Sequence, residues 1–271
     1  MGGLAVIGDV GGHPDQLRWA LDWLGAEDGL LPPDLVVVQV GDLVDRGPGS
    51  SGVLDEVARM LAEQPLQWIQ LVGNHEAQYL PGGTLFWPDP LAARDVDRLR
   101  AWWANGSLRV AAAVRTADGD ELLLTHAGLT LACWQQLGEP TQAAVAAELL
   151  NDRPDLIWQA GDHGRDGRAG PLWAESGAAL HEPWMAHPGI VPFGQVHGHS
   201  TIVHFGDRRW RCTGRVRQRA TVDWDARQVR VRIGARPFIG VDPGHGRLGA
   251  AGWRPLVLPG ATLCDAMPSP S

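Results

Sequence analysis

The sequence has no lysine, a single tyrosine and only three cysteines. All 23 basic residues are arginine, and 31 acidic residues outnumber them, which gives a formal net charge of −8. General nucleic-acid-binding proteins are usually basic, so nucleic acid is not expected as a partner. Cys133, Cys212 and Cys264 are odd in number and widely spaced, which argues against a disulfide framework and against a zinc ribbon.

Long apolar runs are also missing. No stretch approaches the roughly 18 apolar residues that a membrane-spanning helix needs, and residues 1–7 are too short and too uncharged for a signal peptide. We therefore expect a cytoplasmic protein without a membrane partner. The 271 residues are 44% hydrophobic and show no repeat or clean linker, which predicts one domain over 1–264 and a flexible tail over 265–271. The sequence does not predict an oligomeric state.

The first part of the chain alternates apolar runs with segments of helical spacing. The runs 4–7, 35–40 and 68–72 are typical of buried strands, and each is followed by Gly-Asp or Gly-Asn. Pro14 suits the first turn of a helix, and Ser50 or Ser51 is predicted to cap a second one. Strand–helix repetition of this kind predicts βαβ units and a mainly parallel sheet.

The pattern changes after residue 80. Helices are predicted over 91–103 and 141–150, and a hairpin over 110–125 turns at Asp118-Gly119. The segments 81–90 and 151–188 are predicted to be irregular and to shape a substrate cleft. Alternating runs predict antiparallel strands over 201–205, 209–213, 220–224 and 228–233. Two sheets packed face to face are the simplest architecture for these elements.

Five short blocks combine glycine with residues that bind metals. Each follows an apolar run, and each alone would be weak evidence, but together and in this order they indicate a two-metal phosphoesterase site. The blocks are Gly8-Asp9-Val10-Gly11-Gly12-His13, Gly41-Asp42-Leu43-Val44-Asp45-Arg46-Gly47, Gly73-Asn74-His75-Glu76, His126-Ala127-Gly128-Leu129 and Gly198-His199-Ser200.

The spacing of these blocks explains why they should meet. Asp9, Asp42 and Asn74 each follow a predicted parallel strand, and reactive groups of α/β sheets gather beyond the carboxyl ends of such strands. Carboxylates brought so close would repel one another unless cations neutralise them. His126 and His199 add nitrogen ligands, and this mixed set suits Mn, Fe or Zn better than Ca. Two such ions would clamp a phosphoryl group and generate hydroxide from a bridging water.

Two further residues suggest roles toward a phosphorylated substrate. Arg46 follows Asp42 closely, and its planar guanidinium can hold two phosphate oxygens. His75 directly follows Asn74 and is placed to protonate the leaving oxygen.

The five blocks resemble the calcineurin-like metallophosphoesterase superfamily, and the Gly-Asp-Leu-Val-Asp-Arg-Gly block is most similar to its phosphoprotein phosphatase branch. That branch includes Ser/Thr protein phosphatases and symmetrical diadenosine tetraphosphate hydrolases. The resemblance covers about residues 4–205 and implies a four-layer α/β/β/α sandwich. It also implies two metal ions, with Mn the first expectation, Arg46 as the phosphate-binding residue, and His75 paired with Asp45 as the general acid. The implied metal ligands are Asp9 and Asp42 for the first ion, and Asp42, Asn74, His126 and His199 for the second.

The first block departs from the family pattern. The family usually has Asp-x-His there, and this histidine binds the first metal, whereas this chain has Gly11. His13 either replaces that ligand or is turned away by the helix that begins at Pro14. In the second case the first metal site is weakened or lost.

A second departure concerns phosphate binding. The phosphatase branch tends to carry another arginine after Leu-Trp, but Leu172-Trp173 is followed here by Ala174 and Glu175. Glu175 would repel a phosphate if it lay near one. The remaining candidates to replace the arginine are Arg165 and Arg168.

Several other residues are expected to be structural. His197 is predicted to have a structural or ligand-supporting role, and Asp242-Pro243-Gly244-His245-Gly246 is predicted to form a turn. The thirteen tryptophans are expected mainly to fill the core. The histidines expected at the surface or in loops are His163, His181, His187, His204 and His245.

The sequence therefore predicts a metal-dependent phosphoesterase acting on a phosphoprotein, a nucleotide or a small phosphate ester. One alternative is dinucleoside polyphosphate hydrolysis, for which Trp87, Trp102 and Trp103 are candidate stacking surfaces. The other is a metal-poor binding protein that keeps the fold without the chemistry, an alternative that Gly11 and Glu175 motivate.

Overall fold

The computed structural model describes residues 2–162, 164, 167–250 and 252–264. Its strands are β1 (Gly3–Ile7), β2 (Leu35–Gln39), β3 (Trp68–Leu71), β4 (Leu108–Arg109), β5 (Ala111–Arg115), β6 (Glu121–Thr125), β7 (Gly194–His197), β8 (Val203–His204), β9 (Arg209–Trp210), β10 (Ala220–Asp223), β11 (Gln228–Ile233), β12 (Arg236–Gly240), β13 (Leu256–Pro259) and β14 (Thr262–Leu263). Its helices are α1 (Pro14–Trp23), α2 (Ser50–Glu63), α3 (Asn74–Ala77), α4 (Ala93–Ala104), α5 (Leu131–Gln136), α6 (Ala143–Asp152), the 3-10 helix η1 (Pro154–Trp158), the π-helix η2 (Ser176–His181), α7 (Glu182–Ala186) and α8 (Gly214–Arg217).

The strands form two main sheets. A five-stranded sheet has the order β13-β1-β2-β3-β4, in which β1 to β4 run parallel and β13 runs antiparallel to β1. A seven-stranded sheet has the order β10-β11-β12-β7-β6-β5-β14, and its central strands β12, β7 and β6 run parallel. The first sheet therefore has four neighbouring parallel strands and the second has three, and within each set the carboxyl ends lie at one edge.

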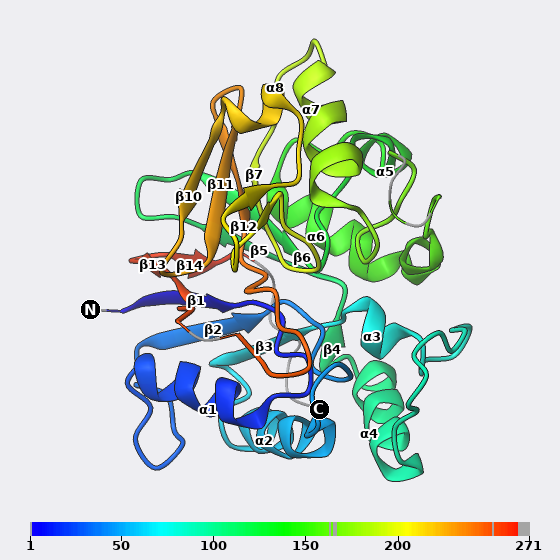
Figure 1. Ribbon diagram of the computed structural model, residues 1–271, viewed down its shortest axis with the longest axis vertical. Helices are drawn as coiled ribbons and strands as arrows, with labels where there is room; N and C mark the ends of the chain where they lie inside the picture. The colour runs from blue at the N-terminus through cyan, green and yellow to red at the C-terminus, as the bar shows by residue number, and fades with distance from the viewer. Residues whose placement is uncertain (1, 163, 165–166, 251, 265–271) are drawn as a thin grey trace.

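The sheets pack face to face, and helices cover their outer sides (Figure 1). On β1, Leu4 and Val6 belong to the cluster between the sheets, whereas Ala5 and Ile7 belong to the cluster beneath the helices. The same alternation places Leu122 and Leu124 of β6 between the sheets. Strands buried on both faces need continuous apolar runs, which these strands have. The predicted four-layer α/β/β/α arrangement is confirmed.

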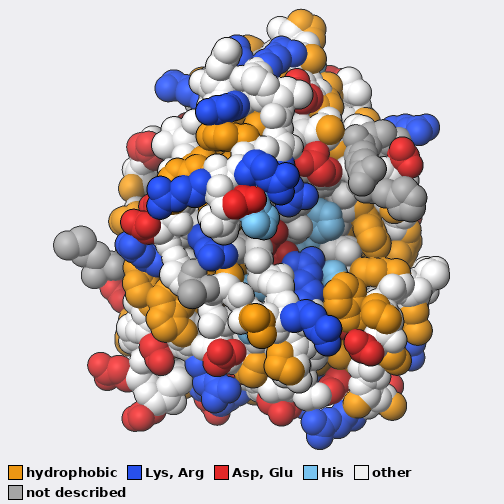
Figure 2. All heavy atoms as spheres, in the orientation of Figure 1, with side chains coloured by type: hydrophobic (Ala, Val, Ile, Leu, Met, Phe, Trp, Pro, Cys, Tyr) orange, Lys and Arg blue, Asp and Glu red, His pale blue; other side chains and the backbone are white. Residues whose placement is uncertain are grey.

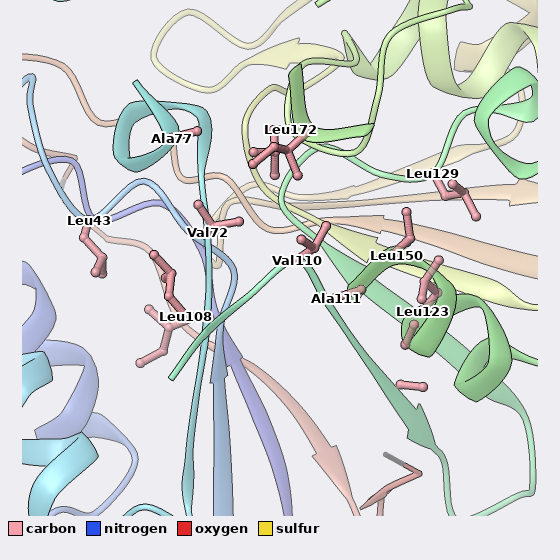
Figure 3. Packing of buried hydrophobic residues seen from close by; sticks show 14 of the residues in the cluster. Leu43, Val72, Ala77, Leu108, Val110, Ala111, Leu123, Leu129, Leu150 and Leu172 are labelled. Carbon is pink, nitrogen blue, oxygen red and sulfur yellow. The ribbon is translucent and has the colours of Figure 1, made fainter. Parts of the chain in front are cut away.

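The chain passes from one sheet to the other at Val110, between β4 and β5. Figure 3 shows this crossing, with Leu108 and Val110 packed between side chains of the two halves. One continuous buried cluster joins Leu17 of α1 to Leu150 of α6 around this side of the sheets. The two halves therefore share one apolar interior.

Most predicted elements are found within a few residues of their predicted bounds, including the antiparallel hairpin of β5 and β6. The prediction of a serine cap was wrong, because α2 begins after Gly49 and its first turn has no side-chain cap. The Ser50 hydroxyl instead accepts a hydrogen bond from the Asp45 backbone N–H at 2.9 Å. The segment 151–188 contains η1, η2 and α7, which the sequence analysis did not predict, and it also missed β12, β13 and β14.

Within the described residues, no helix is both long and apolar enough to span a membrane. The predicted tail 265–271, together with His163 and Arg165, lies outside the described residues.

The contact between the strand ends gives a test of sheet packing. A Cβ atom at Gly8 would lie 2.0 Å from the backbone oxygen of Val241, so alanine forces the two sheets apart. We expect Gly8→Ala to lower the free energy of unfolding by about 1–3 kcal/mol, measured by urea denaturation. Gly52→Ala, inside α2, is the matched control. Its Cβ atom would meet only Pro14, at an ordinary contact distance of 3.4 Å. This control should gain up to about 1 kcal/mol, and equal stability of both variants would contradict the packing described.

Candidate active site

Six parallel strands end at one place between the sheets. Asp9, Asp42 and Asn74 follow β1, β2 and β3, and His126 and His199 follow β6 and β7. Contacts tie these ends across the two sheets: the Asp9 carboxylate accepts a hydrogen bond from the His199 backbone N–H at 2.9 Å. The sequence analysis predicted this gathering for all five residues, although each comes from a distant part of the chain.

Four of these side chains form a compact donor group. The Asn74 side-chain oxygen lies 3.1 Å from His126 Nε2 and 3.0 Å from His199 Nδ1. Asp42 Oδ1 lies 3.3 Å from His126 Nε2, and the two imidazole nitrogens are 3.2 Å apart. Asp42, His126 and His199 are the acidic and histidine residues of the described chain that form a metal-binding group of three.

Hydrogen bonding shows why this group fits a cation. His126 Nδ1 lies 2.9 Å from the Val40 carbonyl, which fixes this nitrogen as the donor and leaves Nε2 with a lone pair. Burial lowers the pKa of His126, and burial with the neighbouring His126 lowers the pKa of His199 to about 3. The lone pair of the neutral His126 ring thus faces a carboxylate and an amide oxygen, and the neutral His199 ring lies beside it. Atoms that present lone pairs to one another repel. A divalent ion that is coordinated by all four side chains would convert this repulsion into binding.

The donors expected for the first metal do not form such a group. Asp9 is fully buried, and its Oδ2 atom accepts no hydrogen bond in the described structure. Gly11 has no side-chain donor, and His13 does not replace it, because its Nε2 atom bonds the Gly246 carbonyl oxygen at 2.8 Å and its ring packs on His245. The hypothesis that His13 supplies the missing ligand is therefore wrong in this structure.

Arg46 lies between the two aspartates. Its Nη2 atom donates to Asp42 Oδ2 at 3.0 Å, and its Nη1 atom is 3.6 Å from Asp9 Oδ2. Burial disfavours the charged guanidinium, but the carboxylates of Asp42, Asp9 and Asp242 outweigh this effect and raise the pKa of Arg46. The side chain is 20% exposed and lines a cleft beside the site.

His75 and Asp45 form the predicted pair. His75 Nδ1 lies 2.8 Å from Asp45 Oδ2, which turns the opposite nitrogen, Nε2, toward Arg46 and Asp42 at 3.4 and 3.9 Å. Burial disfavours the charged ring, but the Asp42 carboxylate and the hydrogen bond with Asp45 raise the pKa of His75 above its ordinary value. A ring held in this way can carry a proton at Nε2.

Gln78 extends this pair to an aromatic loop, a link that the sequence analysis missed. Its amide nitrogen donates to Asp45 Oδ2 at 2.7 Å, and its amide oxygen accepts from the backbone N–H groups of Phe86 and Trp87. The rings of Phe86 and Trp87 meet the His75 ring edge-on, with centroids 5.1 and 5.0 Å away. One buried amide therefore fixes both the carboxylate behind His75 and the loop in front of it.

Glu76 holds the turn that carries the ligands. Its carboxylate is fully buried and accepts four backbone hydrogen bonds, from Asp42, Leu43, Val44 and Gly73. Asp42 has a positive φ of 56°, a conformation that is costly for residues other than glycine. These bonds give the turn after β2 its shape. The residue was part of a quoted block, but its fourfold role had no signal in the sequence.

A cleft of about 1000 Å³ opens beside Arg46 and is lined by residues 45–51, 87–92 and 246–248. Figure 2 shows histidine and acidic side chains in a hollow near the centre of this face, with arginine and hydrophobic side chains around it. The prediction that loop 81–90 shapes the cleft is confirmed for residues 87–90. No described residue of 151–188 lines this cleft.

Several residues lie elsewhere than predicted. His181 was expected at the surface or in a loop but is buried in η2, whereas His245 lies in a loop, as expected, and is buried there. Trp102 of α4 is buried in the core, Trp103 is partly buried against it, and neither lines the cleft beside Arg46. Glu175 caps η2 by accepting a hydrogen bond from the Ala178 N–H, which accounts for a carboxylate that was expected to repel phosphate.

Other predictions agree with the structure. His197 is buried next to the ligands and outside the donor group, with Nδ1 3.0 Å from the Gly198 carbonyl oxygen. His204 is exposed and pairs with Asp207 at 2.6 Å. In contrast, Arg168, a candidate to replace the missing phosphate arginine, is exposed and does not line the cleft beside Arg46, so its position does not support that role.

The segment 242–246 forms the predicted turn, in which the Gly244 N–H donates to Asp242 Oδ1 at 2.7 Å. Asp242 follows β12, the third parallel strand of the larger sheet, and is buried near Asp9. Burial and then Asp242 are the main causes that raise the pKa of Asp9. The sequence analysis did not predict this third buried carboxylate, although it follows an apolar run as Asp9 and Asp42 do.

The role of Glu76 can be tested by stability. Glu76→Ala leaves four buried N–H groups without an acceptor, so we expect the free energy of unfolding to fall by about 3 kcal/mol or more in chemical denaturation. Glu76→Gln should also destabilise, because an amide NH₂ cannot accept two of these bonds. Glu63→Ala, at an exposed helix position paired with Arg59, is the control and should change stability by less than about 1 kcal/mol. A loss at Glu76 no larger than at Glu63 would refute this role.

Comparison with known proteins agrees with the architecture and the motifs. Solved structures with a similar fold include a point mutant of a cold-active protein tyrosine phosphatase, which is 18% identical, with 90% of this chain and 72% of that chain covered and a TM-score of 0.52. They also include a putative diadenosine tetraphosphatase (19% identity, 97% and 93% covered, TM-score 0.47) and a Ser/Thr phosphatase from Saccharomyces cerevisiae (16% identity, 99% and 81% covered, TM-score 0.46). No curated protein sequence matches the chain. The family model for calcineurin-like phosphoesterases matches residues 3–211, and the chain therefore belongs to the calcineurin-like phosphoesterase family.

Proposed function

We propose that this protein hydrolyses phosphate monoesters with the help of a divalent metal ion, and that manganese is the first metal to test. Membership of the family supports phosphate ester hydrolysis as the general activity. The observation that carries the proposal is the convergence of Asp42, Asn74, His126 and His199 into one donor group within reach of Arg46 and His75.

The donor group, Arg46 and His75 have different roles in the proposed reaction. A metal ion bound by the donor group would neutralise phosphate charge and lower the pKa of a water molecule. Arg46 donates from its solvent-facing side to phosphate oxygens, which its planar guanidinium can hold in pairs. His75 gives the proton at Nε2 to the leaving oxygen, while Asp45 holds the opposite ring nitrogen.

The cleft beside Arg46 is larger than a phosphate group needs. Its walls include Trp87, Pro88, Pro90 and Leu91, and the acidic Asp89. An organic group attached to the phosphate would lie against these apolar side chains. A phosphoprotein side chain, a nucleotide and a small phosphate ester all remain within this substrate class.

Dinucleoside polyphosphate hydrolysis is the second candidate. Trp87 lies on the cleft wall and is partly exposed, so it offers a stacking face for a base. The other two proposed stacking residues, Trp102 and Trp103, lie in the core. A metal-poor binding protein is less well supported, because the donor group, Arg46 and the His75–Asp45 pair are all in place.

Turnover of a generic aryl phosphate with added Mn²⁺ tests the main proposal. We expect Asp42→Asn to lose both its activity and its bound metal, because the substitution removes the negative charge of a proposed ligand. His75→Asn should lower kcat by about 100- to 10000-fold while the metal content is retained, because general acid catalysis alone is removed. His204→Asn, at the surface, is the control and should match the wild type. If the Mn²⁺-loaded wild type hydrolyses no phosphate ester, the enzyme proposal is wrong.

The two substrate classes separate at Trp87. If bases stack on this ring, Trp87→Ala should raise KM for diadenosine tetraphosphate by about 10-fold or more and leave KM for an aryl phosphate nearly unchanged. Steady-state kinetics on both substrates gives the answer. Equal increases in KM for the aryl phosphate and the dinucleotide would contradict base stacking on Trp87.

A further inference from the structure

Members of this family generally use a dinuclear metal site, but the donors of this chain are divided unequally. Four of them converge in the group of Asp42, Asn74, His126 and His199. On the other side of Asp42, Asp9 uses one oxygen to accept from the His199 N–H and has no hydrogen bond at the other. Gly11 adds no donor there, and His13 bonds the Gly246 carbonyl oxygen.

Arg46 occupies the space on this side. Its two terminal nitrogens face Asp42 Oδ2 at 3.0 Å and Asp9 Oδ2 at 3.6 Å, so one guanidinium connects both carboxylates. The backbone of Arg46 has a positive φ of 60°, in the left-handed region that non-glycine residues rarely adopt. This conformation belongs to a turn that Glu76 and Ser50 support through the backbone N–H groups of residues 42–45.

Gly11 and Arg46 fit each other sterically. A Cβ atom at Gly11 would lie 3.5 Å from Arg46 Cδ and 3.7 Å from His245 Cβ. The stem of the arginine and the buried His245 therefore pack against the backbone where a side chain at position 11 would project. The glycine at position 11 therefore leaves room for the Arg46 side chain in its observed position.

The charges of the buried aspartates and of Arg46 also argue against a second metal ion. Asp9, Asp42 and Asp242 are all buried, and Arg46 is the cation that makes ion pairs with Asp9 and Asp42 among the described arginines. A second divalent ion between Asp9 and Asp42 would meet the guanidinium at short range. Like charges at such distances in a buried site repel strongly, so either the ion or the arginine must leave.

We propose that this protein binds one divalent ion tightly, at Asp42, Asn74, His126 and His199, and that the Arg46 guanidinium takes the place of a second ion by pairing with Asp9 and Asp42. This inference rests on the metal-binding part of the proposed function and not on turnover. It gives Arg46 two tasks, because the same group neutralises the aspartates and faces the cleft where a phosphate would enter.

The test is the number of Mn²⁺ ions per chain. Purified protein is stripped with a chelator, reloaded with Mn²⁺ and analysed by elemental analysis and by electron paramagnetic resonance. We expect one tightly bound ion per chain, a second ion binding at least about 100-fold more weakly, and the spectrum of isolated ions. Two ions of similar affinity with the spectrum of a spin-coupled pair overturn the proposal.

Variants of Arg46 assign the cause. Arg46→Met removes the charge but keeps an unbranched side chain, so affinity for a second ion should rise by about 10- to 100-fold. Arg46→Lys keeps the charge and should still bind one ion. Arg115→Met, at an exposed arginine paired with Glu121, is the matched control and should also bind one ion. If Arg46→Met binds no second ion, Arg46 does not take the place of that ion between Asp9 and Asp42, and the proposal fails.

Asp242→Asn tests the alternative that Asp242 supplies a donor for a second ion. If the wild type binds two ions and this variant binds one, Asp242 supplies the donor that Gly11 lacks, and the proposal is overturned. The metal count needs no substrate, so it can fail independently of the proposed function. A one-ion protein without turnover keeps the inference and ends the enzyme proposal, whereas a two-ion protein with turnover does the reverse.

Discussion

The site depends on the repulsion between buried acceptors that the fold forces together. Asp42, Asn74, His126 and His199 turn lone pairs toward one another within about hydrogen-bond distance. The Val40 carbonyl oxygen takes the proton of His126 at Nδ1, so His126 Nε2 meets Asp42 and Asn74 only with its lone pair. A cation among these acceptors would convert their repulsion into binding, and a rigid backbone keeps them together without it.

That rigidity comes from residues that never reach the substrate. Glu76 binds four backbone N–H groups around the ligand turns, and Gln78 joins Asp45 to the aromatic loop. Both follow the ligand Asn74 within a few positions of the chain. A ligand and its supports thus share one short segment, which makes the geometry of the metal group and that of the proton donor depend on the same turn.

The sequence predicted what local patterns encode. Apolar runs followed by Gly-Asp, Gly-Asn, Gly-His or His-Ala-Gly predicted that Asp9, Asp42, Asn74, His126 and His199 come together, because parallel strand ends must converge. It could not predict β13 and β14, whose partners β1 and β5 lie far away in the sequence. The burial of His245 and Asp242 was not predicted for a similar reason, since a turn-like segment rich in Gly and Pro carries no sign that it packs beside Asp9 and Gly11. The Ser50 cap failed because the Asp45 N–H binds its hydroxyl.

The last strands have a consequence for how the chain folds. β1 pairs with β13 in register from Gly3 opposite Pro259, and β14 pairs with β5 in the other sheet. During synthesis, β1 therefore keeps one open edge until β13 has been made, and unpaired edges invite association between chains. The late segment closes both sheets at once, so folding of the two halves is completed by the same few residues.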